Sequence, residues 1–338
     1  MGKYAIKSHS LYPVLSTFPV SVLSLNLPLI FHKVMKKILV ITYSQSGQLD
    51  EIVENITKPL AGKVDIIREK LSPLPDFPFP WKDISFWDSM PESVELIPSQ
   101  INPLHIDPND NYDLIILGYP IWFLSPPIPL TTFLKSAEAK KILNGKPVIT
   151  VIGSRNMWVS AQEDIKKMIL ENGGLLKGNI SLRDKHHNLP SVVTIIYWMI
   201  SGKKDRYLGI FPKPGISDKD IGEAERFGQP ILAAVQADEF ENLHEELLRL
   251  KSIELIPNIV SIEKKGKRLF KIWSGFILKK GGPGSKERIG RLKLFKWYLL
   301  FVIFAVSPIA TIIFYITYPL FFMKINRNIK YYKGINLR

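Results

Sequence analysis

The turn at residues 43–49, Tyr-Ser-Gln-Ser-Gly-Gln-Leu, has the residue types that bind a phosphate group. It leads from an apolar strand-like segment into a helix-like one. Such a junction gathers unpaired backbone N–H groups and the positive end of the helix dipole, which together favour an anion. Ser44 and Ser46 add hydroxyl donors, and Gly47 allows close backbone approach. Because the lysine of a nucleoside-triphosphate loop is absent, the turn favours the single phosphate of a mononucleotide, the alternative being an ordinary strand–helix turn.

Two later segments have the same strand-then-loop pattern. The apolar residues 113–118 precede the aromatic loop 119–126, and residues 147–153 precede the polar loop 154–158. In a doubly wound sheet, ligands bind beyond the carboxyl ends of the strands. We therefore expect the three loops to converge on one crevice, where the first loop holds phosphate, Trp122 stacks on a flat ring, and the third loop reaches the ring edge.

This arrangement resembles the flavodoxin and NAD(P)H:quinone reductase families over about residues 36–182. The resemblance implies a flavodoxin-like α/β fold with a doubly wound, parallel, five-stranded sheet. It also implies FMN as cofactor, with NADH or NADPH as a candidate reductant. The residues matched to the FMN loops are Ser44, Gln45, Ser46, Gly47, Gln48, Leu49, Pro120, Ile121, Trp122, Phe123, Gly153, Ser154, Arg155, Asn156 and Trp158.

A narrower likeness rests on residues 43–49, on Gly-Ser-Arg-Asn-Met-Trp at 153–158 and on a C-terminal apolar segment. This combination looks like the family of dialkylresorcinol condensing enzymes. The chain has no cysteine, whereas condensation of thioesters normally uses a cysteine nucleophile. A flavin enzyme would more plausibly oxidise a cyclic diketone to the aromatic resorcinol, an aromatase role.

We therefore expect an FMN-dependent oxidoreductase that acts on a lipid-like cyclic ketone or a quinone. The alternatives are a membrane-tethered one-electron carrier, an NAD(P)H:quinone reductase, and a flavodoxin-shaped interaction module without a cofactor. A carrier is typically short and strongly acidic, which fits this chain poorly.

Three residues are candidates for catalysis. Arg155 beside the pyrimidine edge of a flavin would stabilise its anionic two-electron-reduced form; the alternative is a surface pair with a carboxylate such as Asp164. His186 and His187 follow the last strand and could move the proton that accompanies hydride transfer; the alternative is a solvated loop. No carboxylate–histidine spacing supports a metal site.

The positive charge of the chain is concentrated in its tail. Residues 258–338 hold 17 Lys and Arg against two Glu, whereas the other 257 residues have a net charge of −1. Within that tail, residues 297–323 carry no charge and exceed the roughly 20 residues that cross a bilayer. Basic residues beside an apolar span favour membrane phosphate over nucleic acid as the partner.

Twelve basic residues between 258 and 296, against five after 323, favour a cytoplasmic body with one C-terminal membrane segment. A buried helix and a re-entrant or interfacial segment are the alternatives. The absence of cysteine is compatible with a reducing cytoplasm.

Alternating apolar and amphipathic segments predict the order of strands and helices. We expect strands at 37–43, 63–70, 112–118, 147–152 and 175–182, and helices at 49–59, 130–140, 159–172 and 217–251, with an apolar segment at 192–200.

A Pro- and aromatic-rich insertion, residues 71–110, is expected to cover the substrate or to form a homodimer contact. The predicted organisation is a leader at 1–34 (an over-extended start, a disordered segment or a signal peptide), an FMN-binding domain at 35–257, a basic juxtamembrane segment at 258–296, a transmembrane or membrane-embedded helix at 297–323 and a basic tail at 324–338.

Overall fold

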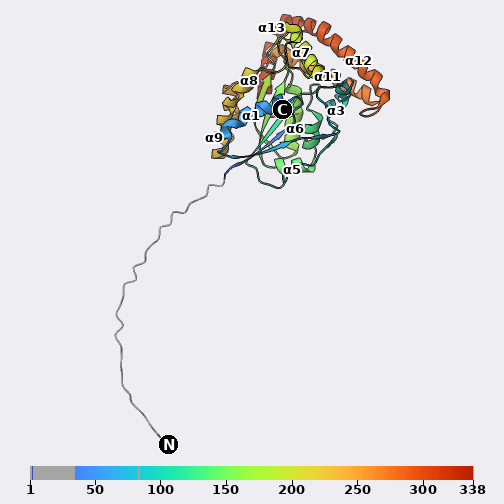
Figure 1. The fold of residues 1–338 in the computed structure, drawn as a ribbon. Coiled ribbons are helices and arrows are strands. Elements are labelled where there is room, and N and C mark those ends of the chain that lie inside the picture. Colours follow the sequence, from blue (N-terminus) through green and yellow to red (C-terminus); the bar gives the residue numbers. More distant parts are fainter. Residues whose placement is uncertain (1, 3–34, 83, 338) are drawn as a thin grey trace. The chain divides into compact units, whose positions relative to one another are not determined.

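A five-stranded parallel sheet forms the centre of the structure (Figure 1). The computed structural model describes Gly2, residues 35–82 and residues 84–337, so the predicted leader lies outside the described residues except for Gly2. The strands are β1 (Lys37–Thr42), β2 (Asp65–Lys70), β5 (Leu114–Pro120), β6 (Pro147–Ser154) and β7 (Leu175–Arg183). Their spatial order, β2–β1–β5–β6–β7, places the switch point between β1 and β5. This order confirms the predicted flavodoxin-like, doubly wound fold.

Side chains of β1 alternate between two cores because successive residues of a strand face opposite sides of the sheet. Ile38 and Val40 belong to one apolar cluster, and Leu39 and Ile41 belong to the other. Helices α1, α8 and α9 lie on one side of the sheet in Figure 1, and α5 and α6 lie on the other. The helices that flank the sheet are α1 (Gln48–Thr57), α4 (Ile128–Leu134), α5 (Ala137–Leu143), α6 (Val159–Glu171), α8 (Asp218–Gly222), α9 (Gly228–Ala237) and α10 (Leu243–Arg249).

Two long helices of the prediction are interrupted in the structure. The predicted helix 130–140 is wrong as a single element, because α4 ends at Leu134 and Ser136 starts α5 by accepting a hydrogen bond from Ala139 N at 3.1 Å. The predicted helix 217–251 is divided into α8, a 3₁₀ turn at Glu223–Phe227, α9 and α10. Asp238, in the left-handed conformation, ends α9.

The insertion 71–110 is anchored on the domain at several points. It contains β3 (Pro73–Leu74), α2 (Ser85–Asp88), α3 (Met90–Val94) and β4 (Gln100–Ile101), and β3 pairs with β4. The backbone N–H of Trp81 donates to the carbonyl of Met199 at 2.8 Å. Met199 belongs to α7 (Asn188–Ser201), the apolar segment after the last strand. The insertion and α7 are therefore joined above the carboxyl ends of the strands.

The basic segment after residue 257 is largely folded onto the body. It forms α11 (Pro257–Leu278), which packs on α3 and α6. Glu263, almost fully buried, accepts a hydrogen bond from Ser160 N at 2.7 Å and so caps the start of α6. Lys267 pairs with Asp164 at 2.9 Å. Part of the predicted juxtamembrane segment therefore belongs to the packing of the domain.

A helical run of 48 residues, Lys286–Lys333, follows α11. It consists of a 3₁₀ turn, α12 (Ile289–Phe301), a π-helical turn (Val302–Val306) and α13 (Ser307–Lys333). Within the part of the chain that the structure describes, it is the one helix long and apolar enough to cross a membrane, and only 11% of its most apolar window is buried. Figure 1 shows α12 and α13 as an arch over the top of the domain. We call Lys286–Lys333 the C-terminal arch.

Candidate functional site

The turn between β1 and α1 forms one end of a cavity of about 170 Å³. Gly47 stands directly before α1 with φ 83°, a left-handed conformation that favours glycine. The hydroxyl of Ser44 is buried and has no hydrogen-bond partner among the described residues. A buried hydroxyl without a partner, next to the start of a ten-residue helix, fits an anionic acceptor. Ser46, Gln48 and Leu49 also line this cavity.

The two glutamines of the turn hold the cavity walls in place. Gln48 donates to the carbonyl of Ile216 and accepts from its N–H, both at 3.0 Å. Gln45 accepts a hydrogen bond from the Tyr43 hydroxyl at 2.6 Å and donates to the carbonyl of Phe77 at 2.9 Å. Their side chains thus tie the turn to a distant loop and to the insertion.

The second loop presents an aromatic wall. Pro120, Ile121, Trp122 and Phe123 all line the cavity. The Trp122 ring meets Tyr43, Phe77 and Trp81 edge to face, at centroid distances of 5.6, 5.0 and 5.4 Å. The structure brings Phe123 to the cavity together with Trp122, the residue expected to stack on a flat ring.

The backbone of this loop is strained. Phe123 and Leu124 have φ values of 48° and 59°, which side chains other than glycine rarely adopt. Lys267 of α11 holds the loop by donating to the Ser125 hydroxyl at 2.6 Å and to the carbonyl of Leu124 at 3.2 Å. Ser93 of α3 donates to the carbonyl of Pro126 at 2.9 Å. Strain held by such contacts is typical of ligand-binding loops.

The third loop brings Arg155 to the cavity, next to Gly153 and Ser154. The Arg155 guanidinium donates to the side-chain and backbone oxygens of Asn188 at 2.7 and 3.2 Å, and Asn156 donates to the same side chain at 2.9 Å. Burial lowers the pKa of Arg155 to about 10, although the charge of Asp184 opposes this shift. The alternative pairing with Asp164 is wrong, because Asp164 pairs with Lys267.

The cavity is closed by residues of the insertion, which was expected to cover the substrate, and of two segments that the sequence did not place there. They come from the insertion, from α7 and from the loop before α8: Phe79, Trp81, Phe86, Ile195, Trp198, Met199 and Gly215. Gly215 has φ 82°, and a Cβ atom there would lie 2.8 Å from both the Gln48 side chain and the Trp198 ring. The aromatic content of the insertion was the one sequence signal for this cover.

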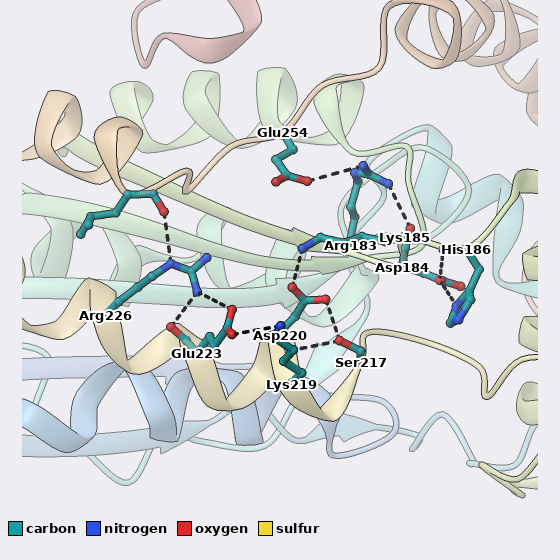
Figure 2. A network of polar contacts seen from close by, with 11 residues as sticks. Arg183, Asp184, Lys185, His186, Ser217, Lys219, Asp220, Glu223, Arg226 and Glu254 are labelled. Carbon is teal, nitrogen blue, oxygen red and sulfur yellow. Dashed lines mark hydrogen bonds and ion pairs between the residues drawn. The ribbon is translucent and has the colours of Figure 1, made fainter.

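The two histidines lie away from the cavity. His186 accompanies Lys204 and Arg206 in a separate hollow, and its Nδ1 lies 2.7 Å from the buried Asp184 carboxylate (Figure 2). His187 directly precedes α7, and neither histidine lines the cavity that holds Arg155. Trp158 is 1% exposed and packs in the core rather than at the cavity. The structure therefore does not bring His186, His187 and Trp158 together with the other candidate residues.

The comparisons with known proteins agree with this architecture. A family model described as flavodoxin matches residues 37–189, a segment that includes all five sheet strands. No curated protein matches the chain. The matched segment and the strand order together define a flavodoxin-like fold.

Solved structures similar to the chain include flavoproteins and flavodoxins. A flavoprotein from Lactobacillus acidophilus, in complex with FMN, is 21% identical, with 43% of this chain and 93% of that chain covered and a TM-score of 0.34. An archaeal flavodoxin is 16% identical, with 59% and 99% covered and a TM-score of 0.33. A Streptococcus pneumoniae flavodoxin is 14% identical, with 59% and 98% covered and a TM-score of 0.30.

Proposed function

We propose that this chain binds FMN and is an FMN-dependent oxidoreductase. The observation that carries the proposal is the cavity that extends from the Ser44–Gly47 turn to the half-buried Arg155 guanidinium. One end offers hydroxyl and helix N-terminal donors for a phosphate, and the other offers a cation for the electron-rich edge of a ring. The buried hydroxyl of Ser154, which also has no partner among the described residues, is a further donor there.

Bound FMN would supply hydride transfer, while the residues of this chain would position the flavin and adjust the charge and water content around it. The positive charge of Arg155 favours the form of the ring that carries extra electrons, and hence two-electron chemistry. The rings of Trp81, Phe86 and Trp122 exclude water and so strengthen that electrostatic effect. Asn188 orients the guanidinium through its two hydrogen bonds.

We propose a lipid-like cyclic ketone or a quinone as the substrate. The aromatic and aliphatic walls of the cavity favour a flat, weakly polar molecule over a charged metabolite. The likeness to dialkylresorcinol enzymes adds one specific candidate, the oxidation of a cyclic diketone to a resorcinol. That conversion removes two electrons and two protons from the ring, which is within the capacity of one flavin.

We also propose that the C-terminal arch holds the body on the cytoplasmic face of a membrane. Its uncharged stretch, residues 297–323, has basic residues on both sides. Ile316, Leu320 and Met323 are 71–84% exposed, an arrangement that is costly in water and favourable in lipid.

FMN binding is tested by denaturing the purified full-length protein and identifying released flavin by chromatography. Gly47→Val is expected to lower FMN retention, because a side chain blocks backbone approach to the phosphate. Gly62→Val is the matched control: both glycines have positive φ and open space around a Cβ. Gly47 stands between the cavity-lining residues Ser46 and Gln48, whereas Gly62 lies beyond the far end of α1. A protein that neither contains nor takes up FMN would overturn the proposal. Equal retention by the two variants would overturn the role of the turn.

A further inference from the structure

A second cavity of about 250 Å³ adjoins the first. Both are lined by Arg155, by Phe123 and by Ile195, so they meet at the proposed ring end of the flavin site. We call the second cavity the apolar chamber. Its walls come from α7, α11, the insertion and the C-terminal arch, and include Val192, Ile196, Ile262, Leu269, Leu299 and Ile303.

Apart from Ser307, the polar side chains that line the chamber form one hydrogen-bonded group. Arg155 and Asn156 both donate to the Asn188 side chain, at 2.7 and 2.9 Å. The side-chain oxygen of Asn156 is buried and has no hydrogen-bond partner among the described residues. A buried amide oxygen of this kind is costly unless a ligand or water donates to it. The chamber therefore has one polar end, which lies beside the first cavity, and an apolar remainder.

The apolar remainder extends to the C-terminal arch. Val302 and Ile303 of the π-helical turn line the chamber, and π-helical turns occur frequently at functional sites. On the same turn, Phe304 and Val306 are more than 40% exposed. One short segment thus forms a wall of the chamber and part of the exposed apolar surface, which gives a chain-like ligand a short route between lipid and chamber.

We propose that the apolar chamber binds the alkyl chain of a single-chain amphiphile whose polar ring lies against Arg155 and Asn156. This inference rests on the proposed function, because it places the reacting ring next to the flavin. A chain in the chamber would be removed from water by aliphatic and aromatic side chains. Affinity should therefore grow with chain length until the chain fills the chamber.

The test measures binding of cyclohexane-1,3-diones with 5-alkyl chains of 1, 4, 8 and 12 carbons to the full-length protein by calorimetry. Affinity is expected to rise by about fourfold for each methylene that is buried, and then to level off. The chamber-filling variant Ile196→Trp should bind the 12-carbon probe no better than the 1-carbon probe. Ile200→Trp, one turn further along α7 and 64% exposed, is the matched control and should keep the chain-length dependence.

Wild-type affinity that is independent of chain length would overturn the inference, as would chain-length dependence that persists in Ile196→Trp. These results leave the proposed function intact if the protein still holds FMN and oxidises the short probe. Chain-length-dependent binding in a protein that takes up no FMN would support the chamber and overturn the proposed function. The two proposals can therefore fail separately.

A second inference concerns the C-terminal arch and rests on its two ends. At its start, Arg288 is fully buried and pairs with Asp88 and Glu92 of the insertion at 2.6 and 2.7 Å. At its end, the carbonyls of Gly334 and Lys333 accept hydrogen bonds from Lys166 of α6 and His244 of α10, both at 2.8 Å. Both ends are thus attached to the same folded body.

We infer that the arch lies in one leaflet of an anionic bilayer instead of crossing the membrane. A straight helix of 48 residues would be roughly 70 Å long and would place its ends far apart. The attachment of both ends to one body requires that they stay on one side of the membrane. The uncharged middle would lie among the lipid tails, with the basic flanks at the headgroups.

Because the chain has no cysteine, single-cysteine variants give a clean test. Gly282→Cys lies before the arch and Asn336→Cys lies after it, and both positions are exposed. In sealed vesicles of phosphatidylglycerol and phosphatidylethanolamine that carry the protein, a membrane-impermeant maleimide should label both variants from the same side. Labelling from opposite sides would show a crossing helix and overturn the inference.

Discussion

The sheet and the C-terminal arch are built from the same apolar residue types but bury them differently. Ile116 in the central strand β5 is fully buried, whereas Ile312 in α13 is 61% exposed. The sheet is stabilised by its own two cores. The arch is fixed to the body at its ends by ion pairs and hydrogen bonds and near its start by the buried Leu292 and Phe295, and much of its apolar middle is exposed. A region that carries its own core needs no partner, while the arch has an apolar surface that lipid would cover.

The largest change in the free energy of unfolding is expected where Arg288 attaches the start of the arch to the insertion. Arg288→Ala would leave the buried Glu92 and the neighbouring Asp88 without their cation, at a cost of about 3–5 kcal/mol in the free energy of unfolding. Lys293→Ala, on the exposed side of α12, is the control and should change stability by less than about 0.5 kcal/mol. Denaturant unfolding measures both. Equal stability of the two variants would show that the joint does not hold the arch.

The next prediction compares one isoleucine from each region. Ile116→Ala should lower the free energy of unfolding by about 2–5 kcal/mol, because it opens a cavity in a close-packed core. Ile312→Ala should leave stability in solution within about 0.5 kcal/mol of wild type but weaken vesicle binding about tenfold. Denaturant unfolding and vesicle sedimentation measure these effects. A loss of stability in Ile312→Ala as large as that in Ile116→Ala would contradict the comparison.

The buried Glu263 of α11, which contacts the start of α6, should make the stability of the protein depend on pH. Burial raises its pKa to about 7, against an ordinary value of 4.5, even though backbone N–H groups oppose the shift. A carboxyl whose pKa is raised in the folded state contributes stability below pH 4.5 that is lost as the pH rises through 7. The loss amounts to roughly 3 kcal/mol.

Glu263→Gln should therefore remove this decline and be more stable than wild type at pH 8. Melting temperatures of the two proteins between pH 4.5 and 8 test the prediction. If wild-type stability does not fall over this interval, or if Glu263→Gln falls by the same amount, the prediction is wrong and burial does not destabilise the charged form of Glu263.

The smallest effect is expected within the flavin site. Arg155→Ala should lower the two-electron potential of bound FMN by about 20–65 mV, the equivalent of a charged hydrogen bond worth about 1–3 kcal/mol. Arg155→Lys retains the charge and should shift the potential less. Anaerobic redox titration measures both. Accumulation of one-electron-reduced flavin over most of the titration would favour the electron-carrier alternative.

Much of the fold could be predicted because its signals are local. Residues 37–42, 114–120 and 147–154 form strands as expected, since buried parallel strands are continuous apolar segments bounded by turn residues. The same strands determine where three loops meet, and Ser44, Trp122 and Arg155 line one cavity. The positions of strands and loops follow from local apolar patterns, whereas the doubly wound strand order was implied by the resemblance to flavodoxins.

The rest depends on contacts between segments far apart in the chain. Trp198 and Gly215 line the cavity because α7 and the loop before α8 fold over it. His186 lies outside the cavity, where its ring is hydrogen-bonded to the buried Asp184 carboxylate. The apolar stretch 297–323 predicts a membrane segment by composition alone. Whether that segment crosses the membrane depends on where its ends are attached, and Arg288 and Gly334 find their partners about 170 to 200 residues earlier in the chain. Composition determines which solvent a helix prefers, whereas only tertiary contacts decide how it is placed in that solvent.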